Sequence, residues 1–103
     1  MMGMNDLVRQ AQIMQQKMAT MQEELKTKTV EASSGGGMIN VTANGGQEIL
    51  SIHIDPTVIN PEDVDMLQDL VLAAVNEALK KARDMVQSEM SQLTGGINIP
   101  GLF

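Results

Sequence analysis

Hydrophobic side chains recur at alternating spacings of three and four residues over the first quarter of the chain. On a helix this spacing places them along one narrow seam, and the positions between them are mostly Gln, Glu, Lys and Thr. The pattern predicts a helix from about Asn5 to Thr27. Its seam is expected to pack within the chain or in a dimer, and a recognition surface is the alternative. The seam consists of Met4, Leu7, Ala11, Met14, Met18, Met21 and Leu25.

Three short segments between residues 29 and 54 alternate with a period of two, as half-buried β-strands require. Gly35–Gly37 predicts a turn after the first segment. Asn44-Gly45 predicts a hairpin after the second, because both residues tolerate positive φ. The sequence therefore predicts a three-stranded antiparallel sheet with one apolar face. That face is expected to carry Val30, Ala32, Ile39, Val41, Ala43, Leu50, Ile52 and Ile54, with Ile49 on the opposite face.

A second long helix is predicted after the sheet. The run 60–63 combines the N-cap side chain Asn60, a Pro at the first helical position and acids in the first turn. Gly95-Gly96 would end this helix after Leu93. Such a helix would span roughly 50 Å, whereas a compact domain of this size has a radius of gyration of about 13 Å. It should therefore project beyond its own domain. The residues expected to hold the helices to each other or to a partner subunit are Leu67, Leu70, Val71, Ala74, Ala78 and Ala82.

The two helices are expected to lie antiparallel, with Leu25 near Val64 at the sheet end. In that arrangement Arg9 falls near residues 80–83 at the far end. Positive charge would then gather at the free ends of the paired helices, away from the acidic middle of the chain.

The order of elements predicts an α+β fold, and 103 residues suit a single domain over residues 1–93 with a flexible tail over residues 94–103. Phe103 is the only aromatic residue and ten residues are Met, so the core is small and adaptable, and a second copy would stabilise it. The absence of Cys excludes disulfides and thiolate metal sites. No apolar run reaches the roughly 18 residues of a membrane span, and the N-terminus lacks a signal-peptide core. These features predict a soluble, cytoplasmic protein with no membrane partner.

The net charge of −6 is unevenly distributed, because residues 29–79 contain eight acidic and no basic residues. All cations therefore lie in the two terminal segments, where a cluster at residues 80–83 could contact phosphates or be an ordinary solvated helix face. Three cations per subunit would give a log-log salt slope of about −5 for a dimer. With no aromatic side chain other than Phe103 to stack on bases, mainly backbone contacts are expected. The candidate DNA-binding residues are Lys80, Lys81, Arg83, Arg9 and Lys17, with Lys26 and Lys28 ranked lower.

Other chemistry finds little support in the sequence. His53 is the only histidine, so a Ser-His-Asp arrangement would have to include it, with Asp55 on the same strand. No motif places either a serine or an aspartate as its catalytic partner. Four acids near residue 65 could bind a metal ion, but acids in the first turn of a helix are explained by their favourable interaction with the helix dipole. No EF-hand spacing is present. We therefore predict no catalytic site, no metal, no cofactor and no small-molecule substrate. The acids in question are Glu62, Asp63, Asp65 and Asp69.

Several strings, taken in order, resemble the YbaB/EbfC family of bacterial nucleoid-associated proteins. They are residues 10–18 (QAQIMQQKM), 21–25 (MQEEL), 37–56 (GMINVTANGGQEILSIHIDP) and 69–78 (DLVLAAVNEA), then Lys80-Lys81-Ala82 and the tail residues Pro100-Gly101. The resemblance covers nearly the whole chain. It implies a tweezers-like cytoplasmic homodimer that binds DNA, associates with the nucleoid and has no enzymatic activity. It also implies a recombination-repair protein as a partner, because members are often encoded beside such proteins.

Taken together, these observations predict a homodimer that binds duplex DNA mainly through phosphate contacts with weak sequence preference. The alternative is an acidic, dimeric protein-binding adaptor or chaperone with a Met-rich helical surface, because Met-rich grooves adapt to many partners.

Overall fold

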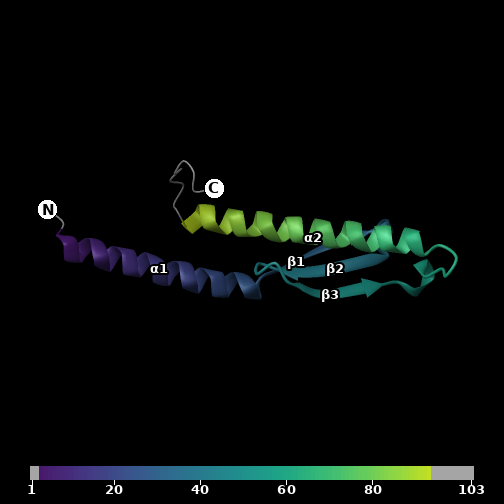
Figure 1. Ribbon diagram of the computed structural model, residues 1–103, viewed down its shortest axis with the longest axis horizontal. Helices are drawn as coiled ribbons and strands as arrows, with labels where there is room; N and C mark the ends of the chain where they lie inside the picture. The colour runs from purple at the N-terminus through teal and green to yellow at the C-terminus, as the bar shows by residue number, and fades with distance from the viewer. Residues whose placement is uncertain (1–2, 94–103) are drawn as a thin grey trace.

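The computed structural model describes residues 3–93 of the chain (Figure 1). Two long helices and a three-stranded sheet make up this part, which confirms the α+β class. The expected flexible tail, residues 94–103, lies outside the described residues. The elements are α1 (Met4–Thr27), β1 (Thr29–Ser34), β2 (Ile39–Asn44), β3 (Ile49–Ile54) and α2 (Val64–Leu93), with short 3-10 turns at Gly35–Gly37 and Pro56–Val58.

The strands form an antiparallel sheet in the order β1-β2-β3, as the alternation predicts. A bulge interrupts the pairing of β2 with β3: Thr42 pairs with Ser51, but Ala43 pairs with Ile49. Because the extra residue inverts the alternation of faces, Ile49 packs against the core and Leu50 is 52% exposed. The expected placement of Ile49 and Leu50 is therefore wrong, since a period-two pattern cannot reveal a bulge.

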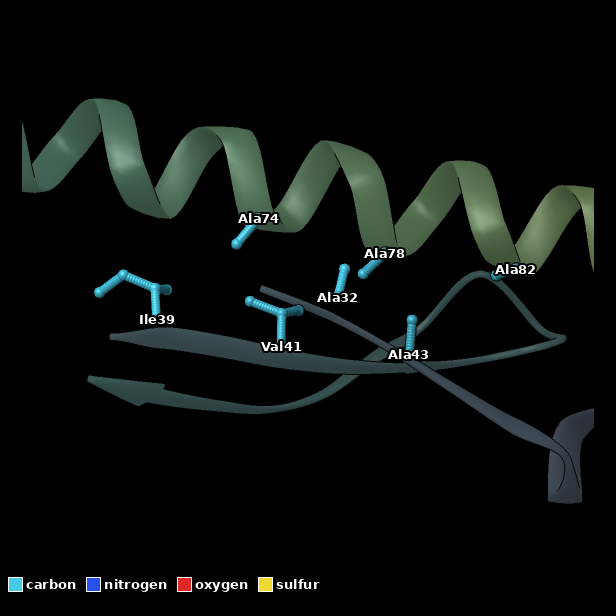
Figure 2. Packing of buried hydrophobic residues seen from close by; sticks show 7 residues of the cluster. All are labelled: Ala32, Ile39, Val41, Ala43, Ala74, Ala78 and Ala82. Carbon is cyan, nitrogen blue, oxygen red and sulfur yellow. The ribbon is translucent and has the colours of Figure 1, made fainter. Parts of the chain in front are cut away.

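The core lies between α2 and the first two strands, while β3 lies beyond the edge of the helix. Ala74, Ala78 and Ala82 recur at every fourth residue and are completely buried on the sheet side of α2 (Figure 2). Their small side chains allow the helix to approach the sheet, where Ile39 and Val41 are equally buried. The remaining expected packing residues lie half-buried around this core and pack against the sheet rather than α1; they are Leu67, Leu70 and Val71.

The start of α2 differs from the expected one. The helix begins at Val64 rather than directly after Asn60. The Asn60 side chain accepts a hydrogen bond from the backbone N–H of Glu62 at 3.0 Å and so closes a separate turn. The cap is Asp63, whose Oδ1 accepts from the backbone N–H of Met66 at 3.2 Å. Asn60 therefore caps a turn, and Asp63 caps the helix.

Helix α1 does not fold back along the length of α2, so the expected pairing of Leu25 with Val64 is wrong. Leu25 instead shares a pocket with Val86, near the other end of α2. Only Lys28 separates α1 from β1, and its backbone is extended (φ −87°, ψ 135°). The helix therefore leaves the sheet as an arm, and its N-terminal half extends past the C-terminal end of α2 (Figure 1).

The arm makes the molecule long and thin. The chain measures 72 × 23 × 16 Å and has a radius of gyration of 19.7 Å, against about 13 Å for a compact domain of this length. Neither helix in residues 3–93 has an apolar stretch long enough to cross a membrane.

Candidate nucleic-acid interface

The arm carries two of the candidate DNA-binding residues, Arg9 and Lys17. Arg9 lies in the N-terminal half of α1, and Lys17 lies near the middle of the helix. Both side chains are exposed, and neither forms an ion pair within residues 3–93. Their charges are therefore available to an external anion.

The cluster on α2 divides into free and anchored cations. Lys80 and Arg83 are exposed and three residues apart, so they lie on one face of the helix. Lys81 lies about 100° around the helix from Lys80, and its Nζ donates a hydrogen bond at 3.0 Å to the backbone oxygen of Glu31 in β1. Lys81 thus ties α2 to the edge of the sheet, a role that the sequence did not indicate.

Two further cations are already paired with carboxylates. The Nζ of Lys28 lies 2.6 Å from Oε1 of Glu89 in α2, and the Nζ of Lys26 lies 3.5 Å from Oε1 of Glu23 one turn away. These pairs neutralise charge near the junction of α1 and β1. The lower rank of both lysines as DNA contacts stays a prediction.

The structure does not bring Arg9 near the α2 cluster, so the expected gathering of these cations is wrong for a single chain. Leu25 and Val86 line the same pocket and so lie at about the same position along the long axis of the molecule. From there Arg9 is sixteen residues, roughly 24 Å, along the arm, and Arg83 is three residues, roughly 4.5 Å, along α2. Figure 1 shows that these displacements run in opposite directions. Arg9 and Arg83 are therefore separated by about 28 Å along the molecule.

Acidic side chains gather at the opposite end of the molecule. The first turns of α2 lie at the end far from the arm (Figure 1), and the acids there are exposed. No group of three or more possible metal-ligating side chains occurs within residues 3–93. The acidic residues at this end are Glu62, Asp63, Asp65 and Asp69.

His53 and Asp55 form no catalytic arrangement with a serine in the described residues. The backbone N–H and hydroxyl of Thr57 donate hydrogen bonds to Oδ1 of Asp55 at 2.9 and 2.8 Å. These two bonds lower the pKa of Asp55, and the nearby His53 lowers it further. Asp55 therefore caps the turn after β3, which is a structural role.

An apolar groove runs between α2 and β3, and the sequence did not reveal it. It exists because α2 lies over β1 and β2 and leaves the β3 side of the sheet open. Ile52 on β3 and Leu72 on α2 are 46% and 60% exposed. The sequence indicates this groove only through the width of the apolar stripe of α2, which extends beyond the three alanines that contact the sheet. The lining residues are Ile54, Leu67, Gln68, Val71, Leu72 and Val75.

Comparisons with known proteins agree with this architecture. The model of the YbaB/EbfC DNA-binding family matches residues 1–97. A nucleoid-associated protein of Pelotomaculum thermopropionicum is 58% identical over 105 residues and covers 100% of both chains. One from Acetivibrio thermocellus is 60% identical over 98% of this chain and 90% of the relative. The crystal structure of the uncharacterized protein HP0035 from Helicobacter pylori superposes with a TM-score of 0.79 at 23% identity, over 91% of this chain and 99% of the other; at that identity it shows the fold alone.

Proposed function

Because the chain belongs to the YbaB/EbfC DNA-binding family, we propose that it is a nucleoid-associated protein that binds duplex DNA as a homodimer. Its contacts are mainly to phosphates, with weak sequence preference, and its place in the cell is the nucleoid. The observation that supports this most strongly is the distribution of charge. Exposed cations without ion pairs lie on the arm and on α2, both of which also carry acids, whereas residues 62–69 at the far end carry four exposed acids and no cation.

The spacing of the cations suits a duplex. Arg9 and Arg83 are separated by about 28 Å along the molecule, which corresponds to about eight base pairs at 3.4 Å each. A duplex lying along the molecule would therefore be long enough to span this distance. Arg9, Lys17, Lys80 and Arg83 have no ion pair within the described part of the chain. Four cations per chain give eight in a dimer, and so an upper limit of about −7 for the log-log salt slope.

A homodimer is supported by the amount of surface that one chain leaves exposed. The chain has 7477 Å² of accessible surface, whereas a compact monomer of 11.1 kDa has about 5,700 Å². The excess is about 1,800 Å² per chain, which is in the range that obligate dimers bury.

The apolar groove between α2 and β3 is the face that we assign to the second copy. Leu72 is 60% exposed there, and Gln68 is the only polar residue in the groove's lining. An apolar patch of this kind favours burial against another protein surface. It also lies apart from Arg9 and Lys17 on the arm, so dimerisation through the groove leaves the arm cations free.

The test is a gel shift of a 30-base-pair duplex (about 100 Å long) at 50 and 200 mM salt, together with sedimentation equilibrium of the protein alone. We expect a dimer that shifts the duplex at low salt and loses affinity steeply at high salt. A triple variant, Lys80→Ala, Lys81→Ala and Arg83→Ala, should shift it less. A monomer at micromolar concentration would refute the dimer, and a salt-independent shift would refute phosphate binding.

A protein-binding adaptor is the second candidate, and a specific observation favours it. Three residues of the α1 seam are largely exposed: Met4 at 77%, Leu7 at 52% and Met14 at 54%. Soft Met side chains suit a partner helix, and the family resemblance implies a recombination-repair protein as that partner. If neither wild type nor the triple variant shifts DNA at low salt, the adaptor function replaces DNA binding.

A further inference from the structure

The junction between α1 and the sheet is closed by the connection between β2 and β3, residues 44–48, which we call the elbow. The backbone N–H of Gly45 donates hydrogen bonds to the carbonyl oxygen of Leu25 at 3.0 Å and to that of Lys28 at 3.2 Å. The last carbonyls of a helix lack partners within it. The elbow therefore caps the C-terminal end of α1 from another part of the chain.

Close approach, rather than backbone conformation, requires glycine at position 45. A Cβ built there would lie 2.4 Å from the carbonyl oxygen of Leu25 and 2.9 Å from its Cβ. Gly45 has no positive φ; in this connection only Gln47 does, at 62°. The hairpin that Asn44-Gly45 predicted is present, although neither of these two residues uses the positive φ that it tolerates.

The elbow is itself held rigidly by the side chain of Asn44, which is only 4% exposed. Its Oδ1 accepts hydrogen bonds from the backbone N–H groups of Gly46 at 2.9 Å and Glu48 at 3.0 Å. Its Nδ2 donates to Oε1 of Glu48 at 3.2 Å. Both the oxygen and the nitrogen of this buried amide therefore have hydrogen-bond partners within the turn.

Two further contacts brace the same joint. Leu25 is the only buried residue of α1 within the described chain, and it lies beside Gly45 and Val86 in one pocket. The ion pair of Lys28 with Glu89 joins the residue after α1 to the last turns of α2. The end of the arm is thus held by the elbow and by an ion pair, and Leu25 lines a pocket together with Val86 of α2.

We propose that the elbow locks α1 in one direction relative to the sheet, and that Gly45 is the positioning residue on which the lock depends. Helix α1 then keeps a fixed orientation relative to the sheet. The spacing between the arm cations and the α2 cations is set before DNA arrives. That consequence rests on the proposed function, whereas the lock itself does not.

The lock can be measured directly, because the chain contains no Cys and labels can be placed cleanly. Spin labels are attached to Gln12→Cys on the arm and Asn76→Cys on α2, both exposed and outside the elbow. Doubly labelled chains are diluted into excess unlabelled protein, so that distances within one chain dominate in a monomer or a dimer. Pulsed electron spin resonance then gives the distance distribution.

Wild type should give one narrow peak, and Gly45→Ala should lose it to a broad or shifted distribution. The matched control is Gly46→Ala, whose Cβ would have as its nearest neighbours side-chain atoms of Lys26, Asn44 and Glu48 at 3.2–3.3 Å, not backbone; it should keep the narrow peak. A broad wild-type distribution overturns the lock. So does a narrow, unshifted peak in Gly45→Ala.

Two readouts keep the proposal testable if Gly45→Ala does not fold. The width of the wild-type peak needs no variant, and the amide of Gly45 should exchange slowly in wild type because it donates to two carbonyls. Rapid exchange of that amide in folded protein would overturn the lock. In DNA titrations a folded Gly45→Ala should bind roughly threefold to tenfold more weakly, the scale of ordering costs at an interface. A narrow wild-type peak without any DNA binding would refute the proposed function and leave the lock standing.

Discussion

Lys80 and Lys81 are neighbours in sequence, and the structure gives them different roles. Lys80 is exposed with no ion pair, whereas Lys81 donates a hydrogen bond to the backbone oxygen of Glu31. The perturbation is a matched pair of single variants, Lys80→Met and Lys81→Met. Methionine keeps most of the aliphatic stem and removes only the charge and its hydrogen bonds. Each variant therefore changes the net charge of a dimer by the same amount.

Stability should respond only to the Lys81 variant. A hydrogen bond of this kind contributes about 0.5–1.5 kcal/mol, and its exposure places it at the lower end of that range. A loss of about 0.5 kcal/mol lowers the Tm of a domain of this size by roughly 2–4 °C. Lys80→Met loses no hydrogen bond within the described residues, so its Tm should stay within about 1 °C of wild type, as is usual for surface substitutions.

DNA binding should respond in the opposite order. Losing one phosphate contact in each subunit of a dimer reduces the log-log salt slope by about 1.8. Lys80→Met should show this reduction in fluorescence anisotropy titrations of a short duplex between 50 and 200 mM salt. Lys81→Met should change the slope less, because its ammonium group is held at the edge of β1. Equal slopes and equal Tm values for the two variants would refute the division of roles.

Three other predictions follow from the fold. Ala78→Leu should lower the free energy of unfolding by about 1–3 kcal/mol in urea titrations, because Ala78 is completely buried against the sheet, while Asn76→Leu on the exposed face should have little effect. Leu72→Lys should shift sedimentation toward monomer and lower Tm, because Leu72 lies in the groove assigned to the second copy and that copy stabilises the fold, whereas Met66→Lys, also exposed, should do neither; equal dissociation by both would reject that interface. Asp55→Asn should be less stable than wild type at pH 7 and equal to it at low pH. The lowered pKa of Asp55 contributes stability that is present above the ordinary pKa of 3.8 and is lost as the pH falls through the folded-state pKa. A stability difference that stays constant across pH in chemical denaturation would reject this.

The elements were predictable because each rests on a local pattern. The seam of α1 and the alternation in β2 require only the spacing of apolar residues. The alanine stripe of α2 also follows from spacing, since Ala74, Ala78 and Ala82 recur at i, i+4 and i+8. The cations of the candidate interface were found from charge distribution alone, and their assignment to DNA remains a prediction.

What the sequence missed depends on contacts between distant segments. The direction of the arm follows from the extended backbone of Lys28 and from the approach of Gly45 to Leu25. Neither leaves a periodic signal. The same holds for Lys81, whose partner is fifty residues away. A pattern of spacings could therefore predict the pieces but not the angle at which they join.

The most direct test of the account compares the salt dependence of duplex binding by wild type and by a quadruple variant. The variant replaces Arg9, Lys17, Lys80 and Arg83 with Ala, none of which has an ion pair in the described structure; Lys81 also has none, but it is kept because it donates a hydrogen bond to Glu31. Wild type should approach a slope of about −7, and the variant should lose most of that slope. Wild type and variant with the same slope would contradict the claim that these four residues bind the phosphates.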